Sequence, residues 1–337
     1  MSNCHNLFQK FNGNLNINSG KKNRLMTSRD NLRDKIRKHF AEKHPDYKPK
    51  FRGQGSYSMK TMIRTKEDTC DLDNGVYFFP KPEETATTIQ KWVKDAVEDA
   101  TSILPQHRER CIRVIYKSDY HIDLPIYYKE SATNDAENPH LAVKDTGWSK
   151  SDPKEFKEWF NKQKNGKGQL IKIVRYLKAW CDNRSKKMPI GLTMTVLATR
   201  NVEYNDRDDI ALRDTLKQIK SSLRLNWCCI MPTTPKDDLL ENFTGSKEYF
   251  FESIDAFIAD ADNAIDTETN QLKASKLWQK HLGSYFPDGE DKDVDKQARS
   301  LLSLATTILE KEAKIDSRGQ IQKHLGVDHK PHKNFGG

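Results

Sequence analysis

The chain has 337 residues and a formal net charge of +9, from 57 lysines and arginines against 48 aspartates and glutamates. Charged residues make up 31% of it, its mean hydropathy is −0.86, and no apolar run approaches the ~18 residues of a membrane-spanning helix. These numbers exclude a helical membrane protein. The first residues also lack a secretory signal pattern, so we expect a cytoplasmic protein. The positive charge suits anionic partners, although a solvated lysine-rich surface explains it equally well.

The six cysteines are scattered along the chain. They form no CxxC pair and have no histidines at zinc-binding spacing. We therefore expect reduced and mostly buried thiols at Cys4, Cys70, Cys111, Cys181, Cys228 and Cys229.

The N-terminal part begins with a polar, Asn-rich stretch, and we expect a loose lead-in over 1–23. A helix is predicted over 28–44, with Ser28 as its N-cap, because apolar residues recur there every four positions and a proline follows. Apolar stretches then predict short strands and one helix. The strands lie within 48–56, 70–79, 111–117 and 120–128, and the helix begins at Ile89.

The pattern changes to helices after Pro153. Amphipathic segments predict helices over 152–163, 168–183, 190–202, 208–225, 246–262, 271–282 and 293–313. The sequence therefore predicts an α+β fold with two lobes and a tail. These are a mixed α/β lobe over 24–150, a helical lobe over 151–315 and a mobile tail over 316–337 that ends in Gly-Gly. A cleft between the two lobes is the expected site.

Two aspartates stand one residue apart in the strand "CDLDNGVYFF". Residues i and i+2 of a strand point to the same side, so Asp71 and Asp73 share a face. Two like charges so close repel, which a site for divalent cations would relieve. The alternative is that the pair ends a strand exposed to solvent.

A third carboxylate, Asp123, lies between apolar residues in "YHIDLPIYY". Alone it would have a structural explanation. On a strand beside Asp71 and Asp73 it would complete a set of three carboxylates, which suits two metal ions and in-line phosphoryl displacement.

The stretch "GQGS" predicts a phosphate-binding turn. Gly53 and Gly55 permit close approach of the backbone, so that N–H groups and the Ser56 hydroxyl can face phosphate oxygens. The candidate nucleotide-binding residues of this turn are Gln54, Gly55 and Ser56. An ordinary turn is the alternative for this motif alone.

The three motifs together carry a family resemblance. The stretches "GQGSYSMKTMI", "DLDNGVYF" and "HIDLPIYY" resemble the polymerase-beta-like nucleotidyltransferases, and most of all the bacterial cGAS/DncV-like nucleotidyltransferases (CD-NTases). The segments 28–40 and 231–243 are also similar to theirs. The loop over 57–70 is longer than in most of the superfamily, and we expect it to bulge over the nucleotide.

The resemblance implies a bilobal nucleotidyltransferase that uses two Mg²⁺ ions, with Mn²⁺ as a substitute. Asp71 and Asp73 would bind both ions. Asp123 would hold the catalytic ion and help to activate the attacking ribose hydroxyl, and Ser56 would hold the donor triphosphate. The implied substrates are ATP and GTP.

The implied product is a cyclic oligonucleotide second messenger, with 3′,3′-cGAMP as the first expectation. Many members act in anti-phage (CBASS) operons, so a separate effector that binds the product is also expected. Recognition of double-stranded DNA is not expected, because the zinc thumb of cGAS is absent from the sequence. A linear oligonucleotide synthase or tRNA-end-adding enzyme, and a non-catalytic nucleotide-binding protein, are the alternatives.

Three further features lead to site predictions. In "GQLIKIVRYLKAWCDN" the cations Lys172, Arg175 and Lys178 fall three apart along one side of a helix, and Lys172 and Arg175 are the candidate nucleotide-binding residues among them. By resemblance to oligoadenylate synthases they would clamp the donor triphosphate, the alternative being a solvated basic face. Gly337 is a predicted conjugation site for a ubiquitin-transfer-like enzyme, and an ordinary frayed tail is its alternative. Candidate base-stacking residues are Tyr57, Tyr77 and Tyr204, for which packing roles are equally open.

Overall fold

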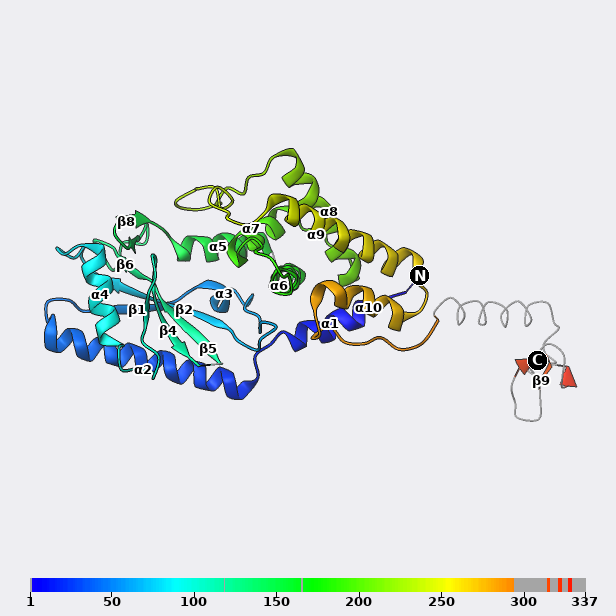
Figure 1. Ribbon diagram of the computed structural model, residues 1–337, viewed down its shortest axis with the longest axis horizontal. Coiled ribbons are helices and arrows are strands. Elements are labelled where there is room, and N and C mark those ends of the chain that lie inside the picture. The colour runs from blue at the N-terminus through cyan, green and yellow to red at the C-terminus, as the bar shows by residue number, and fades with distance from the viewer. Residues whose placement is uncertain are drawn as a thin grey trace, which may run out of the picture.

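Figure 1 shows the computed structural model of the chain, with an α/β lobe beside a helical lobe. The structure describes residues 2–117, 119–164 and 166–293, and the backbone of three short paired strands, β9 (Lys314–Ile315), β10 (Ile321–Gln322) and β11 (Val327–Asp328). The helix predicted over 293–313 lies outside the described residues apart from its first position. The predicted tail over 316–337 is described only in β10 and β11.

The N-terminal segment is helical and packed, which corrects the predicted loose lead-in over 1–23. Helix α1 (His5–Asn14) buries three apolar side chains, Leu7, Phe8 and Phe11. The Phe8 ring lies within 5.1 Å of the rings of Tyr176, Trp278 and Phe286, measured between centroids. The stretch is polar on average, but its few apolar residues lie on one side of the helix. This apolar face is enough to pack a short helix against the helical lobe.

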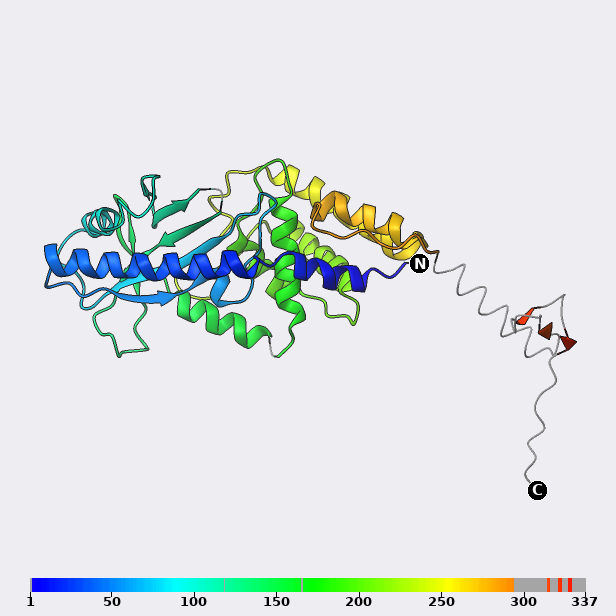
Figure 2. The ribbon, with the colours of Figure 1, turned by 90° about the horizontal axis from the view of Figure 1, so that it is seen from below.

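The long helix α2 (Ser19–Lys43) begins earlier than predicted. Its N-cap is Asn18, whose side chain accepts a hydrogen bond from the backbone N–H of Lys21 at 2.7 Å. The predicted cap, Ser28, lies inside the helix, and its hydroxyl is 2.9 Å from that of Tyr120. Figure 2 shows α1 and α2 almost end to end, so that together they run beneath both lobes.

A mixed sheet forms the body of the α/β lobe. Its strand order is β3-β4-β5-β2-β6-β7-β8, and β1 pairs with β2. Pro125 divides the single strand predicted over 120–128 into β5 and β6, and the hairpin β7–β8 was not predicted. The bounds are β1 Lys50–Gly53, β2 Asp71–Phe78, β3 Gln106–His107, β4 Ile112–Tyr116, β5 Tyr120–Leu124, β6 Ile126–Tyr128, β7 His140–Val143 and β8 Gly147–Lys150.

The two faces of this sheet differ in chemistry. One face packs against α2 and α4 (Ala86–Ala96), and apolar residues such as Leu72, Ile122 and Val114 are buried there. Alternation along the strands turns the neighbouring positions to the other face. That opposite face carries the acidic residues of β2 and β5, so the helices leave it free for a site.

The helical lobe follows the sheet directly, since β8 ends at Lys150 and α5 begins at Pro153. It has one large apolar core, to which α1 also contributes. The stretch "WCCIM" (227–231) forms an isolated bridge, between Ile230 and Asp238, and no strand. The elements are α5 Pro153–Lys164, α6 Gln169–Asp182, α7 Gly191–Asn201, α8 Asp208–Leu225, α9 Lys247–Asp262, a π-helical turn Asn263–Thr267 and α10 Gln271–Leu282.

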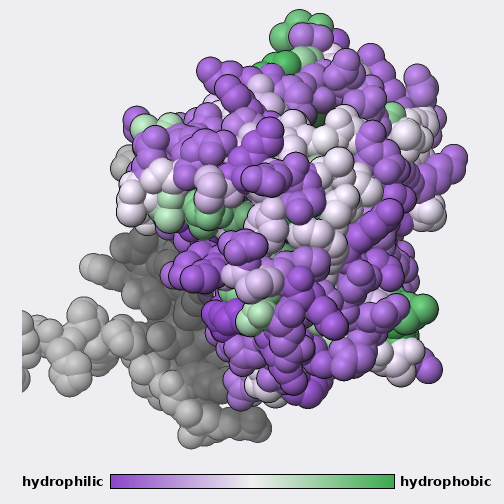
Figure 3. Space-filling view, turned by 90° about the vertical axis from the view of Figure 1, so that its left-hand side faces the viewer, coloured by the Kyte–Doolittle hydropathy of each residue, from purple (hydrophilic) through white to green (hydrophobic). Residues whose placement is uncertain are grey.

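The surface agrees with the composition. The end of the α/β lobe seen in Figure 3 is largely hydrophilic, with scattered hydrophobic side chains. In the described part of the chain, no helix is both long and apolar enough to cross a bilayer.

Candidate active site

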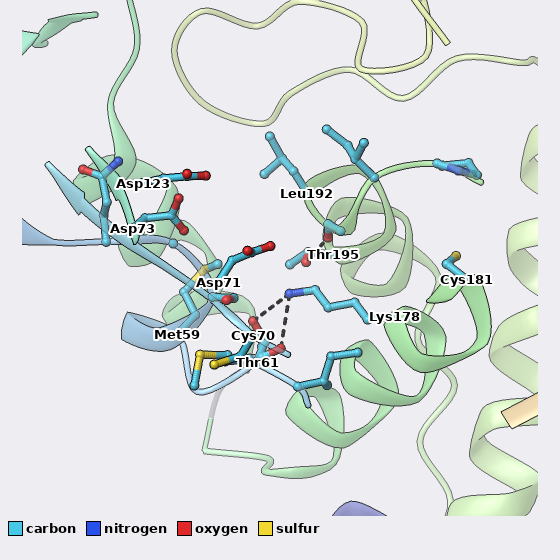
Figure 4. A pocket seen from close by; sticks show the side chains of 18 of the residues that line it. Met59, Thr61, Cys70, Asp71, Asp73, Asp123, Lys178, Cys181, Leu192 and Thr195 are labelled. Carbon is cyan, nitrogen blue, oxygen red and sulfur yellow. Dashed lines mark hydrogen bonds between the residues drawn. The ribbon is translucent and has the colours of Figure 1, made fainter. Parts of the chain in front are cut away.

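The three predicted acidic residues lie together on the open face of the sheet. Strands β2 and β5 run parallel in a register that places Asp73 opposite Asp123 and Asp71 opposite His121. Residues paired in this way in neighbouring strands point to the same side of the sheet. Figure 4 shows the three carboxylates directed into one space. The fold therefore brings Asp71, Asp73 and Asp123 together, as the sequence predicted.

Two of these carboxylates have protein partners. The guanidinium of Arg113, opposite Asp123 in the β4–β5 ladder, donates to both carboxylate oxygens of Asp123 at 2.7 Å. Nδ1 of His121 is 3.0 Å from Oδ1 of Asp71. Within the described residues, no three acidic, histidine or cysteine side chains converge as a ready metal site.

Asp73 shows the electrostatic cost of this arrangement. Burial, together with the charges of Asp123 and Asp71, raises the pKa of Asp73 from 3.8 to about 6. Lys178 and Arg113 oppose that shift only in part. A buried carboxylate beside two others is an environment that a divalent cation relieves. The oxygen donors present therefore fit Mg²⁺ or Mn²⁺.

The predicted Gly-Ser turn is a single helical turn, α3 (Gly55–Ser58), which begins directly after β1. Gly55 has a φ of +64°. A Cβ at this position would lie 1.8 Å from Oδ2 of Asp73. Both facts require glycine, because the backbone conformation is left-handed and the carboxylate leaves no room. The turn and the acidic strand are therefore in direct contact.

Gln54 and Ser56 flank this glycine and line the cleft. The backbone N–H of Gln54 donates to the carbonyl of Asp73 at 3.2 Å. Its side-chain amide donates to the hydroxyl of Tyr127 at 3.0 Å. Gln54 thus fastens the turn to the sheet.

A cleft of about 900 Å³ lies between the two lobes. The acidic residues and α3 form one wall, and residues from α5, α6 and the start of α7 form the other. Basic side chains surround it at Lys66, Arg113, Lys157, Lys178, Lys186 and Lys187. This combination of carboxylates and cations suits a polyanionic ligand bound with a metal.

Lys178, on α6, is the cation that the sequence analysis did not select. Its Nζ donates to the carbonyl oxygen of Thr61 at 3.3 Å and to the Thr61 hydroxyl at 3.1 Å, and Figure 4 shows it extending toward Asp71. Burial lowers the pKa of Lys178 to about 8, and the charge of Asp73 opposes this shift. The sequence did contain a signal for Lys178, since it lies three residues after Arg175 in the same row of basic residues.

Lys172 and Arg175 require a correction, because neither lines the cleft. Nζ of Lys172 lies 2.9 Å from the buried carboxylate of Asp208. The Arg175 guanidinium is 5% exposed and bonds the side chains of Asn12 and Asn16. Lys172 thus joins α6 to α8, and Arg175 joins α6 to the α1–α2 segment. The two side chains point in different directions because positions three apart do not complete a turn of 3.6 residues.

The predicted stacking residues also lie elsewhere, because Tyr57, Tyr77 and Tyr204 are absent from the cleft lining. Tyr77 is 3% exposed and stacks on Tyr127. The apolar lining of the cleft is mainly aliphatic and sulfur-containing, with Met59, Met62, Ile63, Met188, Pro189, Ile190, Leu192 and Met231.

The long loop between α3 and β2 contributes to the cleft lining, as its predicted position suggested. It is held from the N-terminal segment and from α6. The backbone N–H of Arg64 donates to the carbonyl of Leu15 at 2.9 Å, and that of Lys66 donates to Asp182 at 2.5 Å.

Comparison with known proteins agrees with this geometry. Residues 49–127 match the family model of the nucleotidyltransferase domain of DncV-like cyclic GMP-AMP synthases. This stretch is similar to the nucleotidyltransferase domain of cGAS/DncV-like enzymes. The matched range contains α3, β2 and β5, and with them every acidic residue of the proposed site. The resemblance inferred from the sequence motifs is confirmed.

Two curated relatives share part of the chain. A cyclic GMP-AMP synthase of Escherichia albertii is 30% identical over 207 residues, covering 56% of this chain and 43% of the relative. One from Escherichia coli is 24% identical over 245 residues, covering 58% and 55%. The chain thus spans about half the length of the curated relatives that it matches.

Solved structures support the fold over a longer range. The apo form of Vibrio cholerae DncV superposes with a TM-score of 0.72 at 18% identity, covering 85% of this chain and 96% of that chain. A DncV variant in complex with ATP and GTP gives a TM-score of 0.73 at 18% identity, covering 85% and 97%. The predicted α+β nucleotidyltransferase fold is confirmed.

Proposed function

We propose that this chain is a metal-dependent nucleotidyltransferase that makes a cyclic oligonucleotide from nucleoside triphosphates. The in-register pairing of Asp73 with Asp123, with Asp71 on the same face, carries the proposal. These carboxylates stand beside a glycine-dependent turn in a cleft that is rich in basic residues. Oxygen donors with a phosphate-binding wall are the parts that nucleotidyl transfer requires.

The metal ligands in this proposal are Asp71, Asp73 and Asp123. Two divalent cations held there would neutralise phosphate charge and polarise the α-phosphate and the attacking hydroxyl. We assign to Asp123 the orientation of the acceptor ribose hydroxyl. The raised pKa of Asp73 supports its assignment as a metal ligand, because a bound cation would restore the ionised form of Asp73.

The triphosphate is assigned to Ser56, Lys178 and the start of α7. The Lys178 side chain packs against Gly191, the first residue of α7, since a Cβ on Gly191 would lie 3.2 Å from Cε of Lys178. The N-cap residue of α7, Ile190, makes no side-chain capping bond, so the positive end of the helix faces the cleft uncapped. A cation and a helix N-terminus together stabilise charge on a leaving pyrophosphate.

The names of the two curated relatives suggest the substrates and the product of this chain. We infer ATP and GTP as substrates and a cyclic dinucleotide such as 3′,3′-cGAMP as product, by analogy with the two cyclic GMP-AMP synthases. A role in anti-phage defence with a separate effector belongs to the same proposal. Conjugation at Gly337 stays a prediction, since that residue lies outside the described part of the chain.

The test is an incubation of the full chain with four labelled triphosphates and Mg²⁺ or Mn²⁺, followed by phosphatase and mass spectrometry. A phosphatase-resistant product that the double variant Asp71→Asn/Asp73→Asn cannot make would support a cyclase. A phosphatase-sensitive ladder would indicate a linear oligonucleotide synthase instead. If the folded wild-type chain turns over no triphosphate with either metal, the proposal is overturned. A Lys172→Gln variant controls for changes of charge outside the cleft.

A further inference from the structure

Arg113 holds Asp123 in a geometry that no other acidic residue of the cleft shares. Its Nε donates to Oδ1 and its Nη2 donates to Oδ2, both at 2.7 Å. The two side chains are only 17% and 12% exposed. A bidentate arginine–carboxylate pair of this kind is strong and directional, and it leaves neither oxygen without a charged partner.

The pair is fixed by the sheet and not by a flexible contact. Arg113 and Asp123 are direct partners in the antiparallel β4–β5 ladder, and Asp123 is the direct partner of Asp73 in the β5–β2 ladder. Arg113, Asp123 and Asp73 therefore form one row across three strands. Strand β4 lies on the side of β5 away from β2, and the guanidinium of Arg113 reaches both oxygens of Asp123.

This pairing bears directly on metal binding at Asp123. A divalent cation at Asp123 must share or take at least one oxygen to which Arg113 donates. It must also approach a guanidinium that carries the same sign of charge.

We propose that Arg113 competes with the divalent cation for Asp123 and keeps this ligand closed until a nucleoside triphosphate is bound. This inference rests on the proposed metal site at Asp71, Asp73 and Asp123. Arg113 itself lines the cleft, so a released guanidinium faces the substrate space. Phosphate oxygens are good acceptors for guanidinium, and they would replace the carboxylate that the metal takes. Metal and nucleotide binding are therefore cooperative, and Arg113 is a positioning residue that couples them.

The experiment measures Mn²⁺ binding to the full chain by the electron paramagnetic resonance signal of free Mn²⁺. Titrations are run with and without an unreactive α,β-methylene ATP analogue, and the analogue alone gives the background. For wild type we expect weak binding of Mn²⁺ alone and much tighter binding with the analogue. For Arg113→Met we expect Mn²⁺ alone to bind about tenfold more tightly or more, because a competing charge is gone. The enhancement by the analogue should shrink by a similar factor.

Three variants make the result specific. Arg113→Lys keeps the positive charge but cannot form the bidentate pair with Asp123, so its gain in Mn²⁺ affinity should be intermediate. It replaces Arg113→Met if the methionine variant does not fold. Arg110→Met removes a nearby arginine that is 63% exposed, and it should bind Mn²⁺ as wild type does. Adding Asp123→Asn to Arg113→Met should cancel the gain in Mn²⁺ affinity, because the carboxylate that binds the metal is then absent.

Two results would overturn the inference, and they are distinguishable. If the Arg113 variants bind Mn²⁺ alone no more tightly than wild type while wild type binds Mn²⁺ with the analogue, the competition is wrong but the metal site stands. If wild type with the analogue binds no Mn²⁺ beyond the analogue's own share, both the inference and the proposed metal site fail.

Discussion

Gly55 and Asp73 are in such close contact that a Cβ on Gly55 would lie 1.8 Å from Oδ2 of Asp73. The turn α3 and the acidic strand β2 are thus one packed unit, in which the missing side chain of Gly55 makes room for the carboxylate of Asp73. The left-handed backbone of Gly55, at φ +64°, adds a second reason for glycine at this position.

Replacing Gly55 with alanine should abolish nucleotide turnover and lower the free energy of unfolding by roughly 1–3 kcal/mol, since it combines a clash with a strained conformation. Product formation and urea unfolding measure the two effects. Gly53→Ala is the matched control. A Cβ on Gly53 would meet nothing within 4 Å, so its unfolding free energy should change by less than about 1 kcal/mol. Equal effects from both alanines would contradict the packing argument.

Lys178 and Lys172 stand on the same helix but should differ in function. Lys178→Met removes a cation beside Asp73 in the cleft, so kcat/KM for the triphosphate should fall by about 10²-fold or more. Lys172→Met leaves the buried Asp208 without its cation, so it should lower the free energy of unfolding by about 1–3 kcal/mol with kcat/KM unchanged. Steady-state kinetics and thermal unfolding separate the two roles. A large loss of kcat/KM in folded Lys172→Met would instead support the triphosphate role predicted from the sequence.

The raised pKa of Asp73 predicts a pH-dependent gain in stability for Asp73→Asn. The folded state binds this proton more tightly than the unfolded chain, with a pKa of about 6 against 3.8. Above pH 6 the ionised carboxylate therefore destabilises the native state. Below pH 6 the native carboxyl is protonated, and below about pH 4 the unfolded chain is protonated as well, so the cost disappears. The asparagine variant should be more stable than wild type by about 1–3 kcal/mol at pH 8 in EDTA, and this gain should vanish near pH 4.

Urea unfolding of Asp73→Asn at several pH values measures that difference. The exposed Asp46, in the loop after α2, provides the control, since Asp46→Asn should show no such trend. A gain that is independent of pH would mean that the ionisation of Asp73 is not its source.

The packed N-terminal helix should be essential for stability. Phe8 is fully buried and contacts three aromatic rings of the helical lobe. Phe8→Ala should lower the free energy of unfolding by about 3–5 kcal/mol. Gln9→Ala, at the exposed neighbouring position of α1, should cost less than about 1 kcal/mol. Urea unfolding of both variants checks this, and a small loss from Phe8→Ala would return the segment to the loose lead-in that its composition suggested.

Several parts of the site were predictable because they depend on short-range regularities. The spacing of Asp71 and Asp73 fixes a common strand face by itself. The apolar setting of Asp123 marked it as unusual, and the "GQGS" stretch marked a turn that needs glycine. Most of the described helices after Pro153 were also predictable, since apolar residues recur in them about every 3.6 positions.

Other parts of the site depend on which elements meet in space, and the sequence contains no local signal for that. Lys172, Arg175 and Lys178 carry equivalent charges at equal spacing, and only the packing of α6 between α1, α8 and the cleft decides that Lys178 reaches the site. The Asn-rich start of the chain was mistaken for a loose segment because the buried side chains of α1 gain their free energy only against distant partners.

By itself, the sequence determined the acidic strand and the glycine turn, because these are local patterns that the backbone must obey. Only the tertiary structure decided which cation of α6 lines the cleft, that Arg113 pairs with Asp123, and that α1 packs into the helical core. Those outcomes are set by strand register and helix packing, which join residues that are far apart along the chain.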